Sequence, residues 1–188
     1  PPHLPFALPT MFTLDAWRYA DPFENWAWYC VALLPIALID AVLVLLFGTR
    51  ARWFQLHAAV NAAICAVSWP EVADILRAPL AAPLEPTTNA WGSILSFCLH
   101  LYHVCFFQLS VVDQYHHLFS VFLCMPFSLL MRTKALSWIY FQATGLPGGL
   151  DYVLLTLVKH GVLDKLAEKR YNARLNAYVR APLGCMGA

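Results

Sequence analysis

The sequence predicts an all-α membrane protein: a polytopic transmembrane helix bundle of about five hydrophobic runs, one of them broken, with an amphipathic C-terminal helix. Of its 188 residues, 60% are hydrophobic and 12% are charged, whereas a soluble domain carries about 25% charged residues. Several apolar runs are long enough to cross about 30 Å of hydrocarbon. Proline-rich or charged segments separate them. The runs cover residues 26–47, 53–69, 89–109, 112–131 and 136–158.

Three regions follow from this pattern. Residues 1–25 are expected to form an extended N-terminal arm at the membrane interface, residues 26–158 the transmembrane bundle, and residues 159–188 a basic amphipathic helix and tail. The arm is rich in proline and aromatic residues, and Trp17 and Tyr19 are its expected interfacial anchors.

The first run contains two residues that are unusual in a membrane helix. Pro35 is expected to kink it. Asp40 lies deep within the run, where an acid needs a partner. Either a neighbouring helix supplies that partner through a hydrogen bond, or Asp40 is a second acid of the histidine site described below.

The second run carries His57 and Asn61, four residues apart and therefore on one helical face. Both side chains are candidates for binding a ligand and, alternatively, for a packing contact. Residues 70–88 contain four prolines and are expected to form a loop, with a short interfacial helix over residues 71–78.

The third and fourth runs are joined within a few residues, which predicts a tight antiparallel hairpin. Its bend contains four of the seven histidines: His100, His103, His116 and His117. Asp113 precedes the last two by three and four residues, so that its side chain can reach either ring. Ionisable groups in apolar surroundings usually face the bundle interior or a bound group, so this stretch is the candidate site.

The fifth run is interrupted by the residues GLPGG, 145–149, which should not hold a straight helix. Whether this run spans the membrane or re-enters it stays open. Asp151 follows the interruption, either as a favourable charge at a helix N-terminus or as another acid facing the site.

The last segment alternates apolar residues at helical spacing with basic ones from 159 to 180. This pattern is typical of a helix on an anionic membrane surface, and docking onto a partner subunit would look the same. Residues 181–188 are expected to be coil.

Four chemistries fit the histidines. They are acyl transfer, a metal site, axial ligation of haem or chlorophyll, and a purely structural polar network. The metal site is disfavoured, because membrane oxygenases need more clustered histidines than this chain has. The six cysteines form no CxxC pair and indicate neither a disulfide framework nor a zinc site.

The order Asp113-x-x-His116-His117-x-x-Ser120 resembles the TLC-domain proteins, the membrane family that includes the ceramide synthases. The resemblance covers residues 26–160. The stretch TGLPGG-x-D, from Thr144 to Asp151, is also similar to short uncharacterised TLC-like proteins of algae and protists.

The resemblance implies that His116 and His117 transfer an acyl group from acyl-CoA to a sphingoid base, with Asp113 orienting them. Two departures stand against this implication. The ceramide synthases have a second acid-rich motif downstream of the histidine pair, and in this chain only Asp151 is found in that region. The chain also has fewer hydrophobic runs than the family.

Two functions are therefore expected. The first is an integral membrane accessory subunit that packs on a larger energy-converting complex, photosynthetic or respiratory, and binds lipid or pigment. The second is a TLC-type lipid acyltransferase. Candidate lipid- or pigment-binding residues are His100, His103, His57, Asn61 and Asp151.

The expected ligands and surroundings follow from these two functions. A lipid is the expected bound molecule, with chlorophyll, carotenoid or haem as alternatives. Membrane lipids and other membrane subunits are the expected partners, and nucleic acid is not. The thylakoid or the mitochondrial inner membrane is favoured as the location, with the endoplasmic reticulum as the alternative.

Overall fold

A computed structural model describes residues 27–186, and the regular structure in this range is helical, which confirms the all-α class. The expected N-terminal arm, residues 1–25, lies outside the described residues. One isolated antiparallel bridge joins Pro86 to Thr133.

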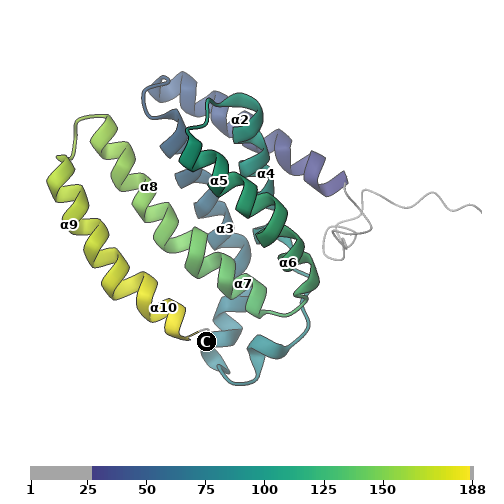
Figure 1. The fold of residues 1–188 in the computed structure, drawn as a ribbon. Helices are drawn as coiled ribbons and strands as arrows, with labels where there is room; N and C mark the ends of the chain where they lie inside the picture. Colours follow the sequence, from purple (N-terminus) through teal and green to yellow (C-terminus); the bar gives the residue numbers. More distant parts are fainter. Residues whose placement is uncertain (1–26, 187–188) are drawn as a thin grey trace, which may run out of the picture.

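The helices of residues 27–186 form six rods that run alternately up and down (Figure 1). Three rods contain a π-helical segment and continue through it without a break. We call these three the α5 rod (111–130), the α8 rod (135–159) and the C-terminal rod (165–186). The single helices are α2 (Ala27–Phe47), α3 (Arg52–Arg77), the short 3₁₀ turn η1 (Ala82–Leu84) and α4 (Trp91–Phe106).

Each composite rod consists of two α-helices around five π-helical residues. The α5 rod is α5 (Val111–Phe119), η2 (Ser120–Cys124) and α6 (Met125–Leu130). The α8 rod is α7 (Ala135–Tyr140), η3 (Phe141–Gly145) and α8 (Leu146–Lys159). The C-terminal rod is α9 (Lys165–Leu175), η4 (Asn176–Arg180) and α10 (Ala181–Met186).

The expected break at residues 145–149 is wrong, because the helix continues through it. A Cβ on Gly145 would lie 2.9 Å from Cys65 Sγ, and one on Gly148 would lie 3.1 Å from Asn61 Nδ2. These glycines therefore let the α8 rod approach α3 closely. Pro147 lies inside the continuous rod, directly after the π-helical segment, and is buried.

The second run does not end before Pro70 as expected, because α3 continues to Arg77. Val72 and Ile75, beyond the proline, are buried against Trp138 and Phe141 of the α8 rod. This packing compensates for the backbone hydrogen bond that the proline removes. The expected loop and interfacial helix over residues 70–88 are thus replaced by the last turns of α3 and a short loop.

The main core lies where α2, α3 and α4 meet. Its side chains are apolar and almost fully buried, and they include Ile36, Leu56, Val60, Ile64, Ile94 and Leu99. Leu136 and Tyr140 connect this core to the α8 rod.

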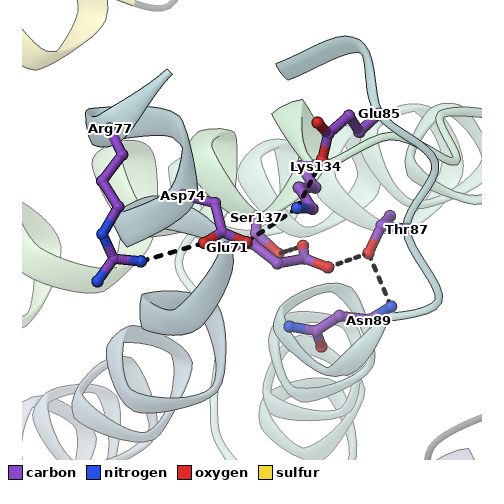
Figure 2. Close-up of polar contacts among 8 residues, drawn as sticks. All are labelled: Glu71, Asp74, Arg77, Glu85, Thr87, Asn89, Lys134 and Ser137. Carbon is purple, nitrogen blue, oxygen red and sulfur yellow. Dashed lines mark hydrogen bonds and ion pairs between the residues drawn. The ribbon is translucent and has the colours of Figure 1, made fainter. Parts of the chain in front are cut away.

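A polar cluster that we call the clasp closes the end of the bundle where α3 ends (Figure 2). Lys134 Nζ lies 2.8 Å from both Asp74 Oδ2 and Glu85 Oε2, and these carboxylates raise the pKa of Lys134. Glu71 accepts hydrogen bonds from Thr87 Oγ1 and, at 2.6 Å, from Ser137 Oγ. The clasp comprises Glu71, Asp74, Glu85, Thr87, Lys134 and Ser137.

The C-terminal rod turns back at Gly161 (φ 75°) and lies along the α8 rod (Figure 1). Asp164 begins it by accepting hydrogen bonds from the backbone N–H groups of Leu166 and Ala167 at 2.9 Å. The expected coil at its end is wrong for residues 181–186, which are helical. Leu183 packs against the buried cluster that contains Val72, Ile75 and Trp138, and its carbonyl accepts a hydrogen bond from Trp138 Nε1. The basic segment therefore docks onto its own chain.

Two of the described helices, α2 and α3, are long and apolar enough to cross a membrane. Helix α2 also exposes large apolar side chains along its length, at Val31, Leu34, Leu38, Val42, Leu45 and Leu46. The two apolar helices and the exposed apolar face of α2 weakly support a membrane protein.

Candidate functional site

Five histidines meet near the end of the bundle opposite the clasp. Helix α3 contributes His57, α4 contributes His100 and His103, and the α5 rod contributes His116 and His117. His116 is exposed and the other four are buried. The hairpin expected from the sequence brings together the four histidines of the bend, and α3 adds the fifth. We call these five residues the histidine cluster.

Four aromatic rings of this region pack against one another. His103 stacks on both Trp53 and His57, with ring centroids 4.1 Å and 4.3 Å away, and these two rings lie side by side with their centroids 5.0 Å apart. The other face of His57 stacks on Tyr152 of the α8 rod at 4.1 Å. His57 therefore stacks with rings from two other elements, α4 and the α8 rod.

Hydrogen bonding defines the tautomer of His100 and thereby that of His116. His100 Nδ1 lies 2.6 Å from the carbonyl of Ser96, so this nitrogen must donate. Neutral His100 then carries a lone pair on Nε2, which accepts from Nε2 of His116 at 3.2 Å. His116 consequently holds a lone pair on Nδ1 at the exposed side of the pair.

Two other histidines carry buried nitrogens that have no hydrogen-bond partner among residues 27–186. Both ring nitrogens of His103 are in this state, and so is Nε2 of His117. Nδ1 of His117 donates to the carbonyl of Asp113 at 2.6 Å. Each unpaired buried group costs about 1–3 kcal/mol.

The carboxylate of Asp113 makes its hydrogen bonds with Ser110 and not with a histidine. Its Oδ2 accepts from Ser110 Oγ at 2.6 Å and from Ser110 N at 3.2 Å, while Ser110 Oγ accepts from Asp113 N. This reciprocal pair is a capping box at the start of α5. Asp113 thus positions His117 through its backbone carbonyl.

Asp40 belongs to an interhelical network away from the histidines. It pairs with Arg52 of α3 and accepts a hydrogen bond from Tyr102 of α4 at 2.8 Å. Of the two roles expected for Asp40, the structure supports the interhelical hydrogen bond.

A cleft of about 460 Å³ lies beside the histidine cluster. Its wall contains His57, Asn61, His100 and His116, together with Tyr152 of α8. Toward the clasp the wall becomes apolar, and the polar groups there satisfy each other, since Ser128 Oγ lies 2.6 Å from the Tyr140 hydroxyl. The apolar part includes Phe97, Phe127, Leu136 and Ile139.

The cleft is open along one side, between the α5 rod and the α8 rod. The α5 rod packs on α4, and wall residues on both sides of the gap, such as Phe119, Phe127 and Ala143, are exposed.

All three π-helical segments contribute to the cleft wall. The lining residues are Ser120 and Cys124 from η2, Ala143 and Thr144 from η3, and Arg180 from η4. A π-turn widens a helix locally and is frequent at functional sites. The cleft therefore lies where three rods depart from α-helical geometry.

Asp151 lines the cleft and begins a chain of hydrogen bonds that ends at Arg180. Asn172 Nδ2 donates to Asp151 Oδ1, Asn176 Nδ2 to Asn172 Oδ1 at 2.7 Å, and Arg180 Nη1 to Asn176 Oδ1 at 2.5 Å. Asp151 is thus linked to the C-terminal rod, while Tyr152 next to it contacts the histidine cluster.

Tyr152 and Arg180 are wall residues that sequence reasoning did not single out. The sequence could have indicated Tyr152, because it directly follows the candidate residue Asp151 after the glycine-rich stretch. Arg180 had none, because its position depends on how the C-terminal rod pairs with the α8 rod.

The residues suited to holding a cofactor are few. No group of three or more His, Cys, Asp or Glu side chains in residues 27–186 is arranged to hold a metal ion. The other four histidines of the cluster are buried, which leaves exposed His116 as the imidazole that a macrocyclic pigment could approach.

Comparison of the chain with protein-family models, with curated proteins and with solved structures gives no match. The site is therefore interpreted from its own geometry.

Proposed function

We propose that this chain is an integral membrane protein that binds one acyl chain of a lipid in the cleft beside the histidine cluster. The observation that carries the proposal is the cleft itself, which is polar at the histidines, apolar toward the clasp and open at the side. Its volume of about 460 Å³ lies within the range of about 300–1,000 Å³ that is typical of small-ligand sites.

The proposal includes a polytopic, TLC-like bundle. Besides α2 and α3, the α5 and α8 rods continue for 20 residues (111–130) and 25 residues (135–159), which gives lengths of about 30 and 37 Å. Exposed apolar residues on the α5 rod, such as Val112, Phe122 and Leu130, would face lipid. The fifth run would then be a full span and not a re-entrant segment.

The test is to purify the full chain in mild detergent and identify the retained lipid by native mass spectrometry. Ala143→Phe places a ring in the cleft, and Ala41→Phe makes the same change on the exposed face of α2. We expect wild type and Ala41→Phe to retain a lipid and Ala143→Phe to lose it. Equal lipid in both variants would contradict the proposal.

Acyl transfer is the second candidate function, and the contact between His100 and His116 favours it. Nδ1 of His116 would attack the carbonyl carbon of an acyl thioester while its Nε2 proton passes to Nε2 of His100. The thiolate would leave and take that proton from His100. An amine or alcohol would then attack the acyl carbon of the acyl-imidazole, and its proton would pass through Nε2 of His100 to Nε2 of His116. Cleavage of the bond between the acyl carbon and Nδ1 would release the acyl product and neutral His116.

This reaction is tested with an acyl thioester and a long-chain amine, followed by product analysis. His116→Gln should abolish the product and leave the retained lipid unchanged. Product formation by that variant at the wild-type rate would exclude His116 as the nucleophile.

The accessory-subunit role builds on the same lipid site, since a subunit can hold a structural lipid without catalysis. The apolar outer face of α2 would then contact a partner in an organelle membrane. Purification from the native membrane, with particle size and absorption spectrum recorded together, tests this role. A small colourless particle would contradict it, and co-migration with a large coloured complex would support it.

A further inference from the structure

One guanidinium reaches the cleft, and it comes from the C-terminal rod. Arg180 is the single Lys or Arg in the cleft wall as far as residues 27–186 are concerned. The hydrogen bonds Asn172–Asp151 and Trp138–Leu183 set an antiparallel register between the two rods. This register places Arg180 opposite residues 141–145, away from both ends of the α8 rod. A cation at such a depth is costly unless an anion balances it.

Most N–H donors of the Arg180 guanidinium make no hydrogen bond within residues 27–186. Its Nη1 group donates to Asn176 at 2.5 Å, and the part of the chain that the structure describes provides no other hydrogen bond or ion pair for it. A guanidinium has five N–H donors. Asn176 therefore orients this side chain and leaves most of its donors available.

The nearest acid in the wall does not pair with Arg180 directly. Two asparagine amides, those of Asn172 and Asn176, stand between the carboxylate of Asp151 and the guanidinium. The hydrogen-bond chain fixes the positions of both charged groups without joining them in an ion pair. Room for a second anion thus remains at Arg180.

We propose that Arg180 binds the oxyanion head, carboxylate or phosphate, of an amphiphile whose acyl chain lies in the apolar part of the cleft. This inference rests on the proposed lipid binding and names the class of lipid. The planar fork of a guanidinium matches two oxygens of a carboxylate or phosphate, and such charge-assisted bonds are about twice as strong as neutral ones. A neutral long-chain alcohol would gain much less from Arg180.

The experiment reconstitutes the full chain in phosphatidylcholine nanodiscs that contain equal mole fractions of either oleate or oleyl alcohol. The amphiphile retained per protein is counted by native mass spectrometry. Wild type should retain oleate over oleyl alcohol by at least about tenfold, the effect expected of one charged hydrogen-bonded contact. A parallel series with lysophosphatidate distinguishes phosphate from carboxylate.

Two charge-matched variants locate the effect. Arg180→Gln should remove the preference for oleate and keep the binding of oleyl alcohol. Arg174→Gln makes the same charge change on an exposed residue of the same rod that does not line the cleft, and it should keep the preference.

The outcomes separate this inference from the function on which it rests. If wild type retains neither amphiphile and no phosphatidylcholine, the proposed lipid binding is wrong. If wild type retains both equally, or Arg180→Gln keeps the preference, lipid binding stands and the role of Arg180 is overturned. The wild-type comparison needs no variant, so it decides the question even if Arg180→Gln does not fold.

Discussion

The clasp and the histidine cluster lie toward opposite ends of the bundle, and they treat their polar groups differently. In the clasp, Lys134 meets two carboxylates at 2.8 Å, and both oxygens of Glu71 accept a hydroxyl hydrogen bond. In the histidine cluster, three buried ring nitrogens of His103 and His117 have no partner within residues 27–186.

This difference predicts opposite effects on stability when polar groups are removed from the two regions. A satisfied polar network holds elements together, and the clasp joins the end of α3 to the loop before α4 and to the α8 rod. A buried polar group without a partner lowers stability. His103 and His117, which carry these nitrogens, do not line the cleft themselves but pack against His57 and His100, which do. The following predictions test this contrast, from the largest expected effect to the smallest.

Glu71→Ala should lower the free energy of unfolding by about 2–3 kcal/mol, because it removes two hydrogen bonds to a charged acceptor and leaves the hydroxyl protons of Thr87 and Ser137 without their acceptor. Chemical unfolding in detergent measures the effect. Glu71→Gln, which keeps one acceptor oxygen, should lose less. A loss below about 0.5 kcal/mol in Glu71→Ala would show that the clasp does not hold the bundle together.

His103→Phe should have the opposite effect to Glu71→Ala and raise the free energy of unfolding by about 1–2 kcal/mol. The phenyl ring keeps the stack with Trp53 and His57 and removes two unpaired nitrogens from the interior. The same unfolding experiment measures it. A clear loss of stability would mean that His103 has a polar partner in the membrane and would end the contrast between the two regions.

Ser110→Ala should cost about 1 kcal/mol by removing the capping box of α5. Asp113→Ala should cost a similar amount, and the double variant should cost less than the sum, because both residues form one unit. Full additivity, or an Asp113→Ala variant that loses lipid without losing stability, would favour a direct role for the Asp113 carboxylate at the histidines.

The smallest effect is a pH dependence at the clasp. Because its carboxylate partners raise the pKa of Lys134 from its usual 10.5, its contribution to stability is complete below that pH. The contribution is lost as the pH rises above it. The melting temperature of wild type should therefore fall toward that of Lys134→Met at strongly alkaline pH. The partners are half-exposed, so the difference is modest, and a constant difference would contradict the assignment.

Much of the helix pattern could be predicted from the sequence, because apolar runs of suitable length lead to helices with few alternatives. The hairpin bend that gathers four histidines followed from the short link between two runs. The expected helix ends at Pro70 and at residues 145–149 were wrong, because proline and glycine usually break a helix when only the neighbouring residues are considered. Burial of Val72 and Ile75, and close packing of Gly145 on Cys65, override those rules, and neither contact is visible locally.

The site was predictable in its histidines and less so in its other residues. Asp113 appeared three and four residues before a histidine pair, and the same spacing serves a capping box with Ser110. Arg180 appeared as one of several basic residues on a surface helix. Only the pairing of the C-terminal rod with the α8 rod brings it to the cleft, and that pairing is a long-range property of the fold.

The π-turns have a consequence for insertions and deletions. Each π-turn accommodates about one residue more than an α-helical turn, and one residue corresponds to about 100° of rotation. Deleting one residue from 141–145 would restore α-helical phase and rotate either Tyr152 or Leu136 away from the cleft by that angle, while the composition of the rod stays nearly unchanged. Deletion of a single codon would therefore change which side chains line this cleft.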